Sequence, residues 1–77
     1  MTPTWAPPYL EAARAKLPDA IDVQADEWLG EDCIYYGVAV HLPSGFRHAV
    51  KWPSPLEPSP ADTADQLLDF CKWRGEA

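Results

Sequence analysis

The side chains of this sequence best suited to metal binding or catalysis are two cysteines and two histidines: Cys33, His41, His48 and Cys71. They suffice in number for a zinc ion, but none of the usual CxxC or HxxxH spacings occurs. A cysteine nucleophile needs a base within hydrogen-bond reach, whereas Cys33 and His41 lie about 27 Å apart along one predicted strand. The four glycines do not cluster into a phosphate-binding loop. We therefore expect no metal site, no cofactor and no enzymatic activity.

Residues 33–52 must position three of these four side chains, and they predict a β-hairpin. Apolar side chains recur at every second position in two runs separated by residues 43–45. If 43–45 form a three-residue loop with Gly45 left-handed, Val38 faces Val50 and Val40 faces His48. A two-residue loop would put the two apolar sets on opposite faces. In the favoured register His41 and His48 lie on opposite faces, so one metal ion cannot bind both.

Residues 20–29 alternate in the same way and predict a strand before this hairpin, with Ile21, Val23 and Ala25 on its apolar side. A two-residue loop at 30–31 would place Val23 opposite Val38. A four-residue loop keeps the same parity, so the register stays open. Residues 20–52 therefore predict a three-stranded antiparallel meander with 33–42 in the centre.

Two helices flank this sheet in the sequence. After an irregular tail at 1–6, residues 7–17 predict a short helix with apolar side chains at three- and four-residue spacing. Four prolines in 53–60 predict a stiff connector, which we interpret as a bridge across the end of the sheet and not as a proline-rich ligand. Residues 60–75 predict the second helix, capped by Ser59, with a buried stripe of Ala64, Leu67, Leu68 and Cys71.

These elements predict an α+β fold class. The whole chain, 1–77, predicts one small domain, a two-layer α-β-β-β-α sandwich with both helices on the apolar face of the sheet. The same element order occurs in double-stranded RNA-binding domains, which carry a lysine cluster at the start of the last helix. This chain has Asp62 and Asp65 there, which would repel a phosphate backbone.

The net charge and apolar content of the chain restrict the kinds of partner that it can bind. Twelve acidic against six basic residues give a net charge of −6, which argues against direct nucleic-acid binding and favours a basic partner. No stretch approaches the ~20 apolar residues needed to cross a membrane, and the first residues do not form a signal peptide. We expect a cytoplasmic protein without membrane contact, whose two cysteines stay reduced.

The predicted interaction surface lies on the first hairpin. Residues 19–32 hold six of the twelve acidic residues and no basic one. The outward parity of the strands adds an aromatic pair, Trp28 and Tyr35, and exposed aromatics beside charge are typical of protein interfaces. Acidic strands also simply confer solubility, which is an equally weighted interpretation. The candidate partner-binding residues are Asp22, Asp26, Glu27, Trp28, Glu31, Asp32 and Tyr35.

The resulting hypothesis is a non-enzymatic protein-interaction module that presents an acidic, aromatic surface to a basic protein partner. In size and charge alone, the chain resembles the small acidic inhibitors encoded by phages and mobile elements, including anti-CRISPR and other anti-defence proteins. The alternative is a regulatory or structural homodimer that pairs through the open sheet face or an edge strand. A small subunit of an enzyme is a third possibility.

Overall fold

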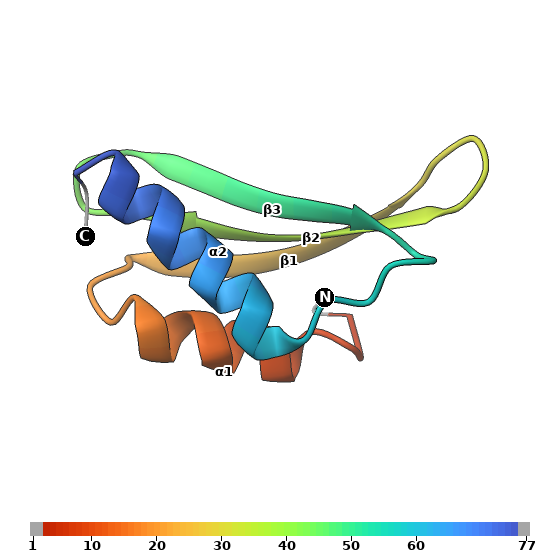
Figure 1. Cartoon of the computed structure of the whole chain (residues 1–77), viewed down its shortest axis with the longest axis horizontal. Helices are drawn as coiled ribbons and strands as arrows, with labels where there is room; N and C mark the ends of the chain where they lie inside the picture. The colour runs from red at the N-terminus through yellow and green to blue at the C-terminus, as the bar shows by residue number, and fades with distance from the viewer. Residues whose placement is uncertain (1–2, 76–77) are drawn as a thin grey trace.

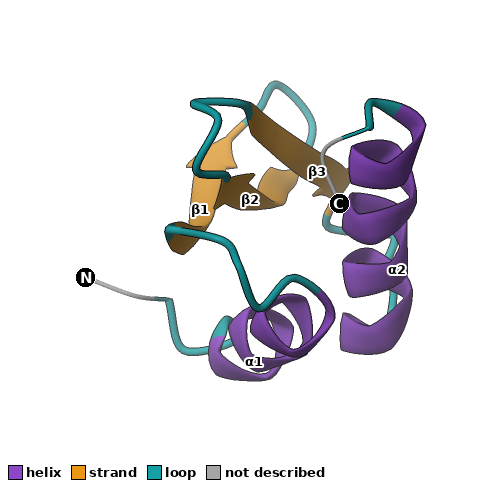
Figure 2. Cartoon of the chain, turned by 90° about the vertical axis from the view of Figure 1, so that its left-hand side faces the viewer, coloured by secondary structure: helices purple, strands orange, loops and turns teal. Residues whose placement is uncertain are grey.

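The computed structural model describes residues 3–75 and confirms the α+β fold in the predicted element order. Helix α1 (Pro7–Lys16) is followed by strands β1 (Asp22–Leu29), β2 (Ile34–His41) and β3 (Arg47–Pro53), and then by helix α2 (Pro60–Trp73). The sheet is an antiparallel meander with β2 in the centre. Both helices lie on one side of the sheet and leave its other side open (Figures 1 and 2).

The hairpin between β2 and β3 has the predicted register. Val38 pairs with Val50 and Val40 pairs with His48. The amide of Leu42 donates to the carbonyl of Phe46 at 2.9 Å, which closes the three-residue loop. Gly45 has a φ of +93°, a conformation that glycine adopts without the steric penalty of a Cβ.

The first hairpin uses the four-residue loop, and the two-residue register is wrong. Val23 pairs with Val40 instead of Val38, and Leu29 pairs with Ile34 across residues 30–33. The amide of Gly30 donates to the carbonyl of Cys33 at 2.8 Å within this loop. Because both loop lengths preserve side-chain parity, the apolar face is unchanged by the shift of two residues.

The core lies between the apolar sheet face and the two helices. Its central side chains are fully or almost fully buried: Val38, Val40, Leu67 and Cys71. Thr63, which the helix pattern did not include, is also buried in the α2 interface. In contrast, Ile21, which was expected on the apolar side of the first strand, is 70% exposed and precedes the start of β1 at Asp22.

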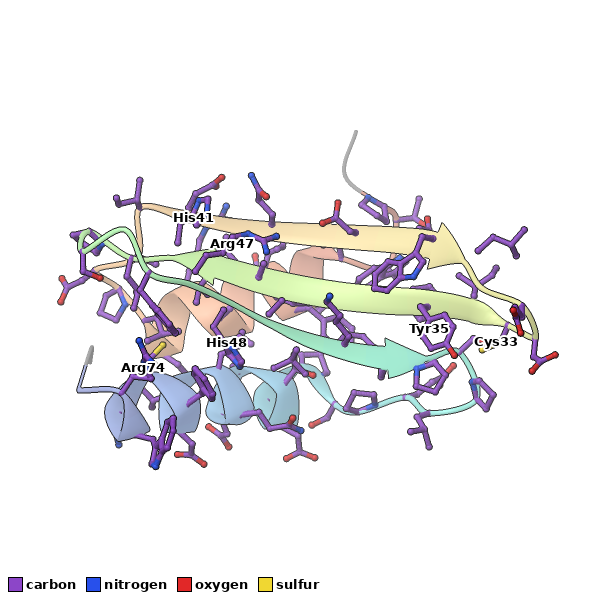
Figure 3. The ribbon with its side chains drawn as sticks, turned by 90° about the horizontal axis from the view of Figure 1, so that it is seen from above. Cys33, Tyr35, His41, Arg47, His48 and Arg74 are labelled. Carbon is purple, nitrogen blue, oxygen red and sulfur yellow. The ribbon has the colours of Figure 1, made fainter. Side chains whose placement is uncertain are left out.

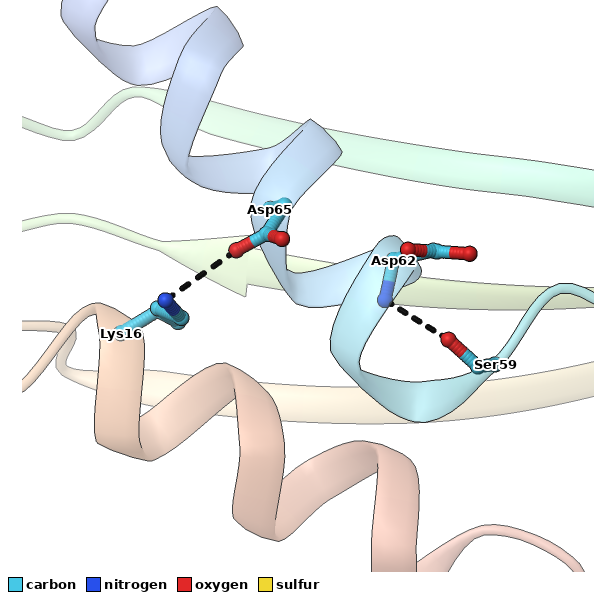
Figure 4. A network of polar contacts seen from close by, with 4 residues as sticks. All are labelled: Lys16, Ser59, Asp62 and Asp65. Atoms are coloured by element: carbon cyan, nitrogen blue, oxygen red, sulfur yellow. Dashed lines mark hydrogen bonds and ion pairs between the residues drawn. The ribbon is translucent and has the colours of Figure 1, made fainter.

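Polar contacts of the helices include an N-terminal cap on α2 and an ion pair between α1 and α2 (Figure 4). The hydroxyl of Ser59 accepts from the amide of Asp62 at 3.0 Å, as expected for a helix N-cap. Lys16 at the end of α1 lies 3.2 Å from a carboxylate oxygen of Asp65 on α2. Both side chains of the ion pair are about half exposed, so this contact contributes little to stability.

Ring contacts fasten α2 to β3. The imidazole of His48 stacks on Phe70 with ring centroids 3.6 Å apart, and Phe46 stacks on Phe70 at 5.9 Å. His48 is therefore a packing residue at the rim of the core, as its place on the apolar face indicated. Burial lowers the pKa of His48 below that of a free imidazole, because the charged ring is poorly solvated there.

The N-terminal segment and the connector between β3 and α2 cover the end of the sheet at which β2 begins and β3 ends. Residues 1–2 of the predicted tail lie outside the described residues, and Ala6 is completely buried at the start of α1. In the connector, the amide of Ser54 donates to the carbonyl of Ile34 at 2.7 Å. The hydroxyl of Tyr9 donates to the carbonyl of Pro58 at 2.7 Å, which ties the connector to α1.

The central position of two β2 valines predicts their effect on stability. Val38→Ala and Val40→Ala should each lower the free energy of unfolding by about 1–3 kcal/mol, since each removes buried methyl groups and leaves a cavity. Urea denaturation followed by circular dichroism measures this. Ile21→Ala, at an exposed site, is the control and should change stability by less than about 0.5 kcal/mol. Midpoints for both valine variants equal to the parent's would contradict this core.

The His48 stack predicts a pH dependence of stability. Since burial lowers the pKa of His48 in the folded state, the unfolded chain binds the proton more tightly. The free energy of unfolding should therefore be fully retained above pH ~6.5 and decline as the pH falls below it. Denaturation at several pH values between 7.5 and 5.5 measures this slope. His48→Phe should flatten it, whereas His41→Gln, on the open face, should leave it unchanged.

Candidate functional site

The predicted site lies on the side of the sheet away from the helices, here called the open face. The strand register places three rows of side chains there, and Figure 3 views them from above. The β1 row is Asp22, Gln24, Asp26 and Trp28; the β2 row is Tyr35, Gly37, Ala39 and His41; the β3 row is Arg47, Ala49, Lys51 and Pro53.

The middle of the open face is hollowed because its floor is made of small residues. Gly37, Ala39 and Ala49 line a shallow hollow of about 400 Å³. Trp28 and Lys51 border the hollow at one end, and Arg47 borders it towards the other. The hollow is open and broad, so it suits contact with a protein surface better than enclosure of a small molecule.

The aromatic pair predicted at this site forms as a stacked pair. The rings of Trp28 and Tyr35 lie 5.8 Å apart at 15°, directly across the β1–β2 pairing. Trp28 remains 41% exposed. The ammonium of Lys51 lies 5.8 Å from the Trp28 ring centre, within cation–π range. The indole is thus both accessible and held in place, as an interface anchor must be.

The open face is not uniformly acidic, because it carries both acidic and basic side chains. Asp22 and Asp26 stand on β1, and the amide of Gln24 donates to Asp22 at 2.9 Å. Arg47 and Lys51 occupy the same face on β3, two strands away. The open face therefore carries carboxylates along one edge and cations along the other, separated by the row of small residues. Sequence reasoning missed the two cations as part of the site, although the parity of β3 already placed them there.

Four of the predicted partner-binding residues share the open face: Asp22, Asp26, Trp28 and Tyr35. Glu27 pairs with Tyr36 and so points to the opposite side of the sheet. Glu31 and Asp32 lie in the 30–33 loop, beyond the end of β1. Together these acids follow the β1 edge and continue round the hairpin tip.

The remaining reactive side chains stay apart. His41 pairs with Arg47 on the open face and His48 faces the helices, so the two histidines lie on opposite faces as predicted. No disulfide joins Cys33, in the 30–33 loop, to the buried Cys71. Within residues 3–75, no group of three or more histidine, cysteine, aspartate or glutamate side chains is arranged to hold a metal ion. Neither helix among these residues has the length and apolar character needed to cross a membrane.

Comparisons with known proteins identify no relative: no protein-family model, no curated protein and no solved structure matches this chain. A function for the chain must therefore be inferred from the geometry and charge of its surfaces.

Gly30 lies against the ring of Tyr35, so a larger residue at this position should disturb the aromatic pair. A Cβ at this position would collide with the ring of Tyr35 and come within 3.0 Å of the Cys33 carbonyl. Gly30→Ala should displace Tyr35 from Trp28 and lower the free energy of unfolding by about 1–3 kcal/mol. Near-ultraviolet circular dichroism and urea denaturation measure both effects. The control is Gly30→Ala in a Tyr35→Ala background, where the cost should be clearly smaller because the ring is gone.

Proposed function

We propose that this protein is a non-enzymatic interaction module that binds a basic surface of a partner protein along its β1 edge. The observation that carries the proposal is the exposed Trp28–Tyr35 stack beside Asp26 on the open face. A large anchored aromatic supplies binding energy at an interface, while neighbouring charges select the partner and speed association.

The position of β1 supports this proposal. As an edge strand it is paired on one side only, and its outward side chains include Asp22 and Asp26. Carboxylates at a sheet edge discourage edge-to-edge pairing with other copies while leaving the strand accessible to a cationic surface. The net charge of −6 also favours association with a cationic surface. A nucleic-acid-binding protein, which must have a basic surface, is the kind of target an anti-CRISPR or other anti-defence inhibitor would block.

The second candidate is a homodimer that pairs through the open face. The observation that favours it is the arrangement of Asp22 and Asp26 on β1 opposite Arg47 and Lys51 on β3. A two-fold axis parallel to the strands and lying over the open face would set the β1 carboxylates of one copy against the β3 cations of the other. Sedimentation of the protein alone distinguishes the two, since only this candidate self-associates.

Charge reversal tests the first candidate. The double variant Asp22→Lys/Asp26→Lys should lose binding to the protein captured from the native host, while wild-type binding should weaken as salt shortens the screening length from ~10 Å at 0.1 M. Trp28→Ala should raise the dissociation rate about tenfold or more, as loss of an interface anchor does. Surface plasmon resonance measures both rates.

The matched control is Glu11→Lys/Asp69→Lys, which makes the same change in net charge at exposed helix positions. This variant should bind almost as well as wild type. Equal loss in both double variants would show that only net charge matters, and full binding by the Asp22/Asp26 variant would place the interface elsewhere.

A further inference from the structure

A second hollow lies on the helix-facing side of the sheet, at the end that the connector crosses. It has a volume of about 130 Å³ and is lined by Trp5, Tyr9, Tyr36, Trp52 and Glu57. An engineered apolar cavity of about 150 Å³ in another protein admits benzene, so this one admits a group of similar size. This aromatic pocket is distinct from the open face, and a ligand bound in it would be independent of the function proposed above.

The four rings form a fixed wall. Trp5 meets Tyr36 at 5.1 Å, Tyr9 at 5.5 Å and Trp52 at 5.9 Å, each close to perpendicular. Tyr9 in turn stacks on Trp52 at 5.4 Å. The rings come from the N-terminal segment, α1, β2 and β3, and the Tyr9 hydrogen bond to Pro58 closes the cluster against the connector. The pocket is therefore formed before any ligand arrives, which lowers the entropic cost of binding.

The electrostatics of the pocket favour a cation. Aromatic ring faces are electron-rich and attract cations, and Glu57 adds an exposed carboxylate to the lining. Glu57 also affects one of the rings. Burial raises the pKa of the Tyr9 hydroxyl, and the negative charge of Glu57 raises it further. The lining contains no lysine or arginine from residues 3–75, so none of the cations in that part of the chain competes for the rings.

Trp5 also holds an unpaired polar atom within the ring cluster. Its Nε1–H is buried and has no acceptor among the described residues. A buried donor without a partner is uncommon in native proteins, because losing its hydrogen bond to water is costly.

From these features we propose that the aromatic pocket binds a quaternary ammonium group. Aromatic walls with one carboxylate match a cation that is bulky, weakly hydrated and without N–H donors, as in choline or a trimethylated lysine side chain. An anion would be repelled by Glu57, and a neutral apolar group would gain nothing from it. A small-molecule ligand and a methylated protein share this chemistry, and the experiment separates them.

The test titrates the full chain with choline and with 3,3-dimethylbutan-1-ol, its uncharged isostere, while NMR follows the indole N–H signals. Trp5→Phe and Trp52→Phe identify the two pocket signals by their loss. Choline should shift these signals saturably, and the isostere should bind about tenfold more weakly or worse, because it has the shape without the charge. Glu57→Gln should weaken choline severalfold without affecting the isostere, and Glu11→Gln is the matched control.

Two peptides of sequence Gly-Lys-Gly, with and without a trimethylated lysine, identify the source. Tighter binding of the trimethylated peptide than of choline assigns the pocket to a methylated protein, and the reverse assigns it to a small molecule. Equal affinity for choline and its isostere would overturn the proposal, since the pocket would then be merely apolar. Absence of a saturable shift with choline and with both peptides would overturn it as well.

Discussion

The two sides of the sheet differ in polarity, and the apolar side must be kept from water. Val23, Val38 and Val40 stand on it in register, and removing such side chains from water is the largest favourable contribution to folding. The apolar stripes of α1 and α2 cover this face and complete the core. The short helix α1, at ten residues, depends equally on the sheet, because isolated helices of this length are marginal in water.

The difference in length between the layers explains where the aromatic residues lie. Strands β1 and β2 have eight residues each and extend about 27 Å, whereas the ten residues of α1 extend about 15 Å and the fourteen of α2 about 21 Å. The helices cannot cover the whole apolar face. At the end that the helices do not cover, large aromatic rings and the connector shield the apolar face from water. Rings that meet edge to face do not fill this space completely. The aromatic pocket is thus a consequence of covering a long sheet with short helices.

The open face and the aromatic pocket give one small domain two surfaces of different chemistry. The open face is broad, charged at its edges and anchored by Trp28, which suits a protein partner. The pocket is small, walled by rings and bordered by Glu57, which suits one bulky cation. They lie on opposite sides of the sheet, because Tyr35 and Tyr36 are neighbours in sequence and successive side chains of a strand point to opposite faces.

The sequence alone determined the element types, their order and the face on which each strand residue lies. These follow from local periodicity, which depends only on neighbouring residues. It also determined the β2–β3 register, because only the three-residue loop with Gly45 matched the two apolar sets. Four of the seven predicted site residues share the open face for the same reason of parity.

Only the tertiary structure decided the rest. The first hairpin's loop length was open because two- and four-residue loops keep the same parity, so no pattern distinguished them. Trp5, within the predicted irregular tail, meets Trp52 from 47 positions away. The exposure of Ile21 likewise did not follow from the alternation of the strand. The residue spacing within one segment does not show which distant segment it will contact. Such contacts are therefore known only from the packed structure.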